Sequence, residues 1–252
     1  MNKKYELLVD DTITFLGWKL FRIKALISFG SVEAGELGGY VAKEGNLSHE
    51  GDAWVSGDAW VYGDAWVSGD ARVSGDARVS DNARVFDNAW VSDNAEVSDN
   101  AEVCGNAEVC GNARVSDNAW VSDNAWVYGD ARVSDNAEVC GNAEVFGDAR
   151  VSDNAEVCGN AEVFGDAEVF GDAEVCGDAR VKSLKDYIVF KNNWSSGRYF
   201  TYTKSNKMWK AGCFYGTGQE LINEAYKDNE NSGKHYEAYV NFVKILEELE
   251  NE

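Results

Sequence analysis

The chain has 252 residues and a net charge of −21, with 44 acidic residues against 23 lysines and arginines, and it contains no proline. No apolar run is long enough to span a bilayer, and the first residues lack the apolar core of a signal peptide. We therefore expect a cytoplasmic protein without a membrane segment. The absence of proline fits a long, regular backbone ladder in which every amide can donate.

Residues 1–50 precede a repetitive region and do not share its pattern. The stretch TITFLGWKLFRIKAL predicts two short strands around a glycine turn, and GELGGYVAKEGNLSHEG leads into the repeats. A solenoid has open ends with unpaired backbone groups and an exposed apolar interior. We therefore predict that residues 1–50 form a small β cap at the N-terminal end.

Residues 51–182 are an unbroken run of six-residue repeats. Valine recurs every six residues from Val55 to Val181, and alanine stands two positions before each valine, which gives 22 hexads without an insertion. Residues two apart point to the same side of a strand, so Ala and Val should form a thin, dry interior. The Gly, Asp and Asn pairs that follow suit turns, because these residues tolerate left-handed backbone conformations.

A second period of 18 residues predicts three hexads per coil. Residue types after the valines segregate into columns, as expected if positions 18 apart stack on parallel strands. We predict a mainly β fold, a single-stranded left-handed parallel β-helix of about seven 18-residue coils. The columns read Tyr62, Ser80, Ser98, Ser116, Ser134, Ser152, Phe170, then Ser68, Phe86, Cys104, Ser122, Cys140, Cys158, Cys176, and the third ends Cys110, Tyr128, Phe146, Phe164, Lys182.

The six cysteines show no CxxC pair and no histidine at metal-ligand spacing. We therefore expect no metal and no cofactor, and thiols that act as small apolar side chains in a reducing compartment. Stacking would bring Cys140, Cys158 and Cys176 within disulfide distance, but reduced thiols remain the expectation.

Residues 183–252 predict a separate α+β module. DYIVF, RYFTYTK and MWKAGCFYG have the alternation and aromatic content of strands, and GQELINEAYK and HYEAYVNFVKILEELE predict helices. Between Lys182 and Thr217 there are seven basic residues and one aspartate. Interleaved cations and aromatics can bind a nucleotide or nucleic acid, and otherwise the aromatics form a small core while the cations face solvent or the acidic repeats. The candidate binding residues here are Arg198, Lys204, Lys207 and Trp209.

The outward position between Ala and Val varies from face to face. Arg114, Arg132 and Arg150 should stack on consecutive coils and repel unless something compensates. Glu138, Glu156 and Glu174 form a stripe of opposite sign on another face, so either subunits dock through these faces, giving a dimer or trimer, or the arginines bind an anion. Indoles expected to be exposed favour docking; they are Trp54, Trp60, Trp66, Trp90, Trp120 and Trp126.

The repeat resembles the hexapeptide-repeat left-handed β-helix family, whose best-known members are trimeric acyltransferases. The segments LFRIKALISFG, GELGGYV, NLSHEGDAWV and YFTYTKSNKMWKAGCFYGTG make the whole layout similar to phage and prophage hexapeptide-repeat proteins often labelled transferases. The acyltransferases use a solenoid histidine and a loop extruded from a coil. The 22 hexads contain neither, which leaves His49 at the junction as the weak catalytic candidate.

The charge is concentrated in the repeats. Residues 51–181 hold 27 acidic residues and 7 arginines, a net charge of −20. Over a rod of roughly 35 Å this is about one charge per 1.75 Å, close to the ~1.7 Å of duplex DNA. Either the rod mimics DNA, or the acidity serves solubility. We expect a non-catalytic acidic interaction protein, phage- or prophage-encoded, that binds a host protein, with an acyltransferase or a nucleotide- or nucleic-acid-binding protein as alternatives.

Overall fold

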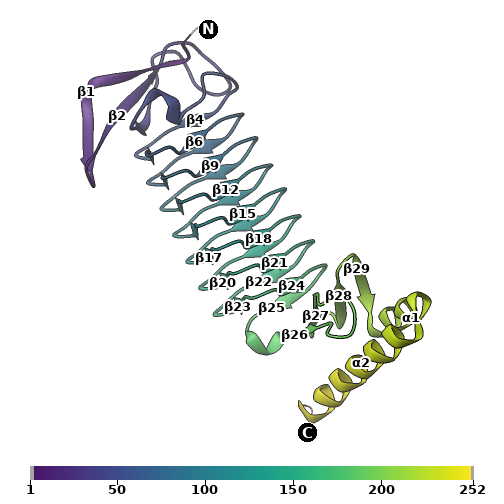
Figure 1. Ribbon diagram of the computed structural model, residues 1–252. Coiled ribbons are helices and arrows are strands. Elements are labelled where there is room, and N and C mark those ends of the chain that lie inside the picture. The colour runs from purple at the N-terminus through teal and green to yellow at the C-terminus, as the bar shows by residue number, and fades with distance from the viewer. Residues whose placement is uncertain (1–2, 251–252) are drawn as a thin grey trace.

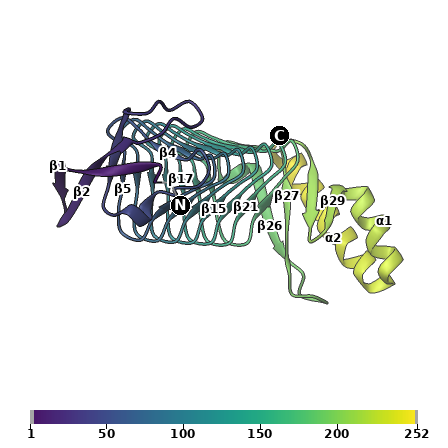
Figure 2. The same ribbon diagram turned by 90° about the horizontal axis from the view of Figure 1, so that it is seen from above.

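The computed structural model describes residues 3–250 and shows a parallel β-solenoid with a β hairpin at its N-terminal end and an α+β module at its C-terminal end (Figure 1). The coils stack one behind another along the rod, with β1 and β2 at one end and α1 and α2 at the other (Figure 2). The predicted mainly β fold is confirmed.

Each hexad contributes one strand of two residues, an outward residue followed by valine. Strands pair in parallel with partners 18 residues away, so Val97 lies beside Val115 and Glu96 beside Arg114. Three hexads therefore complete one coil, as the 18-residue period predicts. On the first face the strands are β5 (Trp60–Val61), β8 (Arg78–Val79), β11 (Glu96–Val97), β14 (Arg114–Val115), β17 (Arg132–Val133), β20 (Arg150–Val151) and β23 (Glu168–Val169). On the second they are β6 (Trp66–Val67), β9 (Arg84–Val85), β12 (Glu102–Val103), β15 (Trp120–Val121), β18 (Glu138–Val139), β21 (Glu156–Val157) and β24 (Glu174–Val175). On the third they are β4 (Trp54–Val55), β7 (Arg72–Val73), β10 (Trp90–Val91), β13 (Glu108–Val109), β16 (Trp126–Val127), β19 (Glu144–Val145), β22 (Glu162–Val163) and β25 (Arg180–Val181).

The interior of the rod consists of the alanine and valine columns, which are fully buried from Ala53 to Val181. The turns between strands need left-handed backbone, for example φ 60° at Asp81 and 68° at Gly63 one coil earlier. A Cβ on Gly63 would lie 2.8 Å from the backbone nitrogen of Asp81, so glycine also allows the coils to approach closely at this corner.

The backbone hydrogen bonds that flank the paired strands run from each coil to the next. The amide of Arg114 donates to the carbonyl of Ala131 at 2.9 Å, and that of Ser116 donates to Val133 at 3.0 Å. At these positions each coil donates to the next coil along the chain. The first coil therefore presents these carbonyl groups, and the last coil these amides, without a neighbouring coil, so both ends require caps.

The solenoid has about eight turns rather than the predicted seven, because residues within 1–50 add a turn. β3 (Leu37–Val41) pairs in parallel with β5, placing Val41 beside Val61, and Leu47 bridges Val67. The Ala-Val pattern does not reveal this turn, since Leu47 and Val55 are eight rather than six residues apart. The two additional residues between Leu47 and Val55 put this turn out of step with the six-residue repeat.

The N-terminal end is covered by a hairpin and by donor side chains. β1 (Tyr5–Phe15) and β2 (Trp18–Ala25) are antiparallel and meet at the expected glycine turn. The Nζ of Lys4 donates to the carbonyls of Gly51 and Ala53 at 3.2 and 2.8 Å. At the end of the short helix η1 (Glu44–Asn46), the buried side-chain amide of Asn46 donates to two further carbonyls, those of Gly63 and Ala65, at 3.2 and 2.8 Å.

The C-terminal end is covered by side chains of both kinds: the Tyr187 hydroxyl donates to the carbonyl of Glu168 at 3.0 Å, and three acceptors meet backbone amides. Thr201 Oγ1 accepts from the amide of Glu174 at 2.9 Å, Ser205 Oγ accepts from Arg180 at 2.7 Å, and Asp186 Oδ2 accepts from Lys182 at 2.7 Å. The module comprises η2 (Leu184–Asp186), β26 (Tyr187–Lys191), β27 (Tyr199–Thr203), β28 (Met208–Ala211), β29 (Phe214–Thr217), α1 (Gly218–Asp228) and α2 (Glu230–Glu250).

The module has four antiparallel strands where the sequence predicts three, because MWKAGCFYG folds back on itself as the hairpin β28–β29. Two helices follow, as expected. Among residues 3–250, no helix combines the length and the apolar composition needed to cross a membrane.

Candidate binding surfaces of the rod and the C-terminal module

The arginine ladder stacks as predicted, and the described residues compensate its charge at its two ends. Arg114 pairs with Arg132, and Arg132 with Arg150, in parallel register. Arg114 lies 3.5 Å from Glu96 below the ladder, and Arg150 lies 3.6 Å from Glu168 above it. Arg132 has no ion-pair partner among residues 3–250. Its exposed guanidinium group is therefore available to an anionic group from outside the chain.

The glutamate ladder on the neighbouring face also stacks as predicted. Glu138, Glu156 and Glu174 are in register on consecutive coils. Burial, and secondarily the charge of Glu156, raise the pKa of Glu138. Burial also raises the pKa of Glu174, although Lys210, 3.5 Å away, opposes this. Part of this ladder is thus already occupied by the C-terminal module.

The turn residues form hydrogen-bonded ladders that the sequence analysis did not predict. At one corner, the side-chain amide of each asparagine donates to the next, with Asn100 to Asn118 at 3.0 Å and Asn118 to Asn136 at 3.1 Å. The aspartates beside them accept from the following coil, as Asp117 does from the amide of Asp135 at 3.4 Å. The recurrence of asparagine every 18 residues is the sequence feature that could have predicted these ladders.

The six tryptophans do not form one patch. They are distributed over all three faces, and Trp54 is buried beneath the N-terminal cap against Tyr5 and Phe29, which corrects its expected exposure. Trp60 is half-buried, with the ring of Phe15 at 4.8 Å. The other four are 41–46% exposed; they are Trp66, Trp90, Trp120 and Trp126.

The basic aromatic segment of the module is largely engaged within the protein. Trp209 is only 2% exposed and packs against Phe200 and Tyr202 in the module core. Lys204 forms an ion pair with Glu250, and Lys207 lies 3.6 Å from Glu247, both on α2. Among the three candidate cations, the described chain thus leaves only the Arg198 guanidinium without an ion-pair partner.

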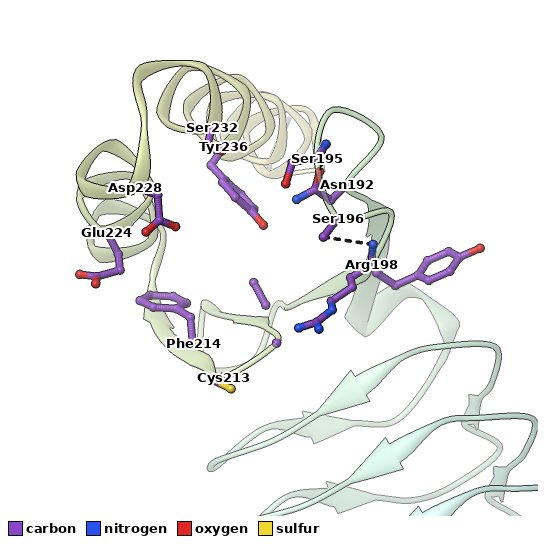
Figure 3. Close-up of a pocket in the computed structure, with 13 residues that line it drawn as sticks. Asn192, Ser195, Ser196, Arg198, Cys213, Phe214, Glu224, Asp228, Ser232 and Tyr236 are labelled. Carbon is purple, nitrogen blue, oxygen red and sulfur yellow. Dashed lines mark hydrogen bonds between the residues drawn. The ribbon is translucent and has the colours of Figure 1, made fainter.

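Arg198 lines a cavity of about 580 Å³ between the strand loops and the two helices (Figure 3). The loop after β26 provides Asn192 and the β28–β29 turn provides Cys213, while α1 and α2 provide Asp228 and Tyr236. No motif or period in the sequence connects these residues with Arg198, because they belong to two loops and two helices that share no spacing.

Arg198 also borders a groove of about 270 Å³ between the module and the rod, where Glu156 and Glu174 lie on the opposite wall. No ion pair joins Arg198 to either glutamate. The arginine thus stands at the junction of the cavity and the glutamate ladder.

His49 is part of the N-terminal cap. Its ring stacks on Tyr5 with centroids 4.5 Å apart, Nδ1 accepts from the amide of Lys4 at 3.2 Å, and Nε2 lies 3.2 Å from Glu44. Both ring nitrogens are therefore engaged in contacts that hold the first strand on the rod.

Two cysteines form a disulfide, which corrects the expectation that all six are thiols. Cys158 and Cys176 are stacked with Cα atoms 4.6 Å apart and are bonded to each other, whereas Cys140 in the same column is free. Among residues 3–250, one group of potential metal ligands combines these two cysteines with Glu156, its ligand atoms lying within 4.8 Å of one another. The disulfide takes up both sulfur donors.

The comparison with protein families agrees with the coil geometry. Residues 77–93 and 107–123 match the YdcK β-solenoid repeat family, and both segments lie inside the rod. The chain is a β-solenoid repeat protein. No curated protein matches it. The family match covers repeats only, and the β-solenoid description therefore rests on the stacked hexads and the Ala-Val interior.

Proposed function

We propose that this β-solenoid is a non-catalytic interaction protein whose acidic rod binds a cationic partner. The supporting observation is how the rod's charges are arranged. Its 27 acidic side chains comprise 18 aspartates, all in turns at the corners, and 9 glutamates on the faces, against 7 arginines. Five of those arginines are ion-paired to glutamates of the rod itself; they are Arg78, Arg84, Arg114, Arg150 and Arg180. Asp58 and Asp64 pair with Arg22 and Lys43 of the N-terminal segment, and the other corner aspartates remain as lines of negative charge along the rod.

A DNA-binding protein is the partner class that this charge distribution fits best. The rod carries about one net charge per 1.75 Å, and a cationic groove shaped for duplex DNA meets about one per 1.7 Å. Within this proposal the protein is encoded by a phage or prophage, works in the cytoplasm, and acts against host defence by mimicry or sequestration of a host factor.

The test is a competition titration. The protein is used to capture partners from a bacterial lysate, and purified captured proteins are titrated with the rod in the presence of duplex DNA. Binding should weaken as salt rises, because screening shortens the range of charge attraction to about 10 Å at 0.1 M, and DNA should compete. A partner that is not displaced by DNA, or binding indifferent to salt, would count against the proposal.

A five-fold variant tests the contribution of one corner. Asp81, Asp99, Asp117, Asp135 and Asp153 lie in one column with φ near 60°, a conformation that asparagine tolerates. Replacing all five with Asn keeps an acceptor oxygen for the next coil and removes five charges. This variant should lose most of the binding, while a single replacement should cost only ~0.2–1 kcal/mol.

The matched control changes the same corner without changing its charge. Ser98, Ser116 and Ser134 each donate to the following aspartate at 3.0–3.1 Å. Replacing these serines with alanine removes the local hydrogen bonds and keeps every carboxylate. The control should bind like the wild type, so equal losses in both variants would show that local structure, and not charge, carries the interaction.

A further inference from the structure

The cavity in the C-terminal module has the size of a small-molecule site and a rim of two opposite charges. Its volume of about 580 Å³ lies within the ~300–1,000 Å³ typical of ligand pockets. Asn192 and Ser232 are buried residues of its lining, and Phe214 contributes an apolar wall. Such a lining can enclose a small ligand while leaving its charged ends to the rim.

Arg198 provides the positive side of the rim. The loop that carries it is fixed by Asn192, whose amide donates to the Arg198 carbonyl at 2.8 Å and whose side-chain oxygen accepts from Ser195 at 3.0 Å. The guanidinium group itself makes no ion pair within residues 3–250. A guanidinium group with free donors can bind a carboxylate or phosphate through paired hydrogen bonds.

Asp228 provides the negative side. It lies at the end of α1, across the cavity from Arg198, with the Tyr236 side chain between them (Figure 3). Its neighbour Glu224 is bonded to Lys227 at 2.6 Å, whereas Asp228 has no ion-pair partner in the described part of the chain. Asp228 is thus the carboxylate of this cavity that is left for an ammonium group.

Tyr236 adds a neutral hydroxyl group between the two charges. Burial raises its pKa, the Asn192 amide opposes this, and the charge of Asp228 adds to the increase. The hydroxyl group therefore stays protonated near neutral pH and can donate to a ligand oxygen.

From this arrangement we propose that the cavity binds a small zwitterion, with the acidic group on Arg198 and the amine on Asp228. The two charges of the ligand are separated by several bonds, because their receptors stand on opposite sides of the cavity. Nucleotides fit less well, since the Asp228 carboxylate on the rim would repel a polyphosphate. This inference does not depend on what the rod binds.

Titration calorimetry with the full-length protein tests it, using two probes that share the amine but differ in the acid. Alanyl-alanine carries a carboxylate and phosphoethanolamine carries a phosphate. Binding of at least one is expected, and which one binds identifies the acidic group. Absence of binding by both at 10 mM, a concentration on the order of the weakest useful affinities, would overturn the proposal.

Probes in which one charged group is chemically blocked test each charge without altering the protein. The same blocking is applied to alanyl-alanine or to phosphoethanolamine, whichever binds. Acetylating the amine or converting the acid to a neutral amide or ester should each weaken binding about 10-fold to 100-fold, as expected for a lost charge-assisted hydrogen bond. If a blocked probe binds as tightly as its parent, the corresponding charge contact does not exist and the proposal fails.

Variants assign each charge to its residue. The Arg198→Gln variant should bind the probe with a blocked acid as well as it binds the parent probe. The Asp228→Asn variant should likewise bind the probe with a blocked amine as well as the parent probe. Asp166→Asn, an exposed turn aspartate on the rod, is the control and should behave like the wild type. Bound probe should also slow alkylation of Cys213, the exposed thiol at the rim. If both cavity variants still bind the blocked probes more weakly than the parent probe, as the wild type does, the assignment is refuted.

Discussion

The Nζ atom of Lys4 lies 2.8 Å from the carbonyl oxygen of Ala53, and it thereby occupies the place of a backbone donor that no preceding coil supplies. The same ammonium group reaches Gly51, and burial lowers its pKa to about 8 despite the nearby charges of Asp52 and Asp70. A buried cation is tolerated here because two carbonyl groups at the end of the ladder need a donor.

Replacing Lys4 with methionine should therefore destabilise the protein, because it leaves these carbonyls buried without a donor. Each unsatisfied group costs about 1–3 kcal/mol. Thermal unfolding followed by circular dichroism measures the loss. Lys3→Met is the control, since Lys3 is exposed and its ion pair with Glu44 lies at the surface. Equal stability of the two variants would contradict the capping role.

The asparagine ladder predicts that a side-chain amide contributes to stability inside the column but not at its end. Asn118→Asp removes the amide that donates to Asn136 at 3.1 Å and brings a carboxylate against an acceptor oxygen. The expected loss is about 0.5–1.5 kcal/mol. Asp172→Asn, at the end where only an acceptor is used, should be nearly neutral. Denaturant unfolding of both variants measures the difference in their free energies of unfolding. No difference would be seen if the asparagine side chains bonded to water and not to one another.

The glutamate ladder predicts greater stability at mildly acidic pH. The pKa of Glu138 is raised in the folded protein by burial and by Glu156, so folding favours the protonated form. This contribution is fully present below the unfolded pKa near 4.5 and is lost as pH rises through the folded pKa. Glu138→Gln should raise the melting temperature at pH 7 and have little effect at pH 4.

The control for this pH experiment is Glu96→Gln. Glu96 lies 3.5 Å from both Arg78 and Arg114, so its removal should lower stability at pH 7 instead of raising it. The same sign of change in both variants would rule out like-charge repulsion in the Glu138 ladder.

The cysteines predict a simple alkylation result. In denaturant without a reductant, four cysteines should react with iodoacetamide, and all six should react after reduction. A peptide linking Cys158 to Cys176 should appear in the unreduced digest by mass spectrometry. Labelling of all six without reduction would show that this pair is a dithiol in solution.

The arginine ladder predicts self-association through Arg132, the ladder arginine that lacks an ion pair in the described residues. We propose that a carboxylate of a second copy compensates it, which gives a dimer or trimer. Arg132→Glu should weaken association in light scattering, while Arg150→Glu should have a mixed effect, since it also breaks the pair with Glu168. A monomer at high micromolar concentration would contradict the proposal.

The sequence by itself determined the rod. Valine at every sixth position, alanine two before it and turn residues after it allow one solution, in which both small side chains point inward and positions 18 apart stack. The Arg and Glu ladders and the corner column of Asp81 to Asp153 follow directly from that arithmetic, because a solenoid converts a fixed sequence spacing into a fixed spatial neighbour.

The tertiary structure alone decided the ends and the cavity. Lys4 and Asn46 cap the first coils and Thr201 caps the last, because the end coils have backbone groups that no neighbouring coil pairs. These ends exist only once the chain is wound. Arg198 and Asp228 face each other from two elements without a shared period, so no spacing in the sequence could pair them.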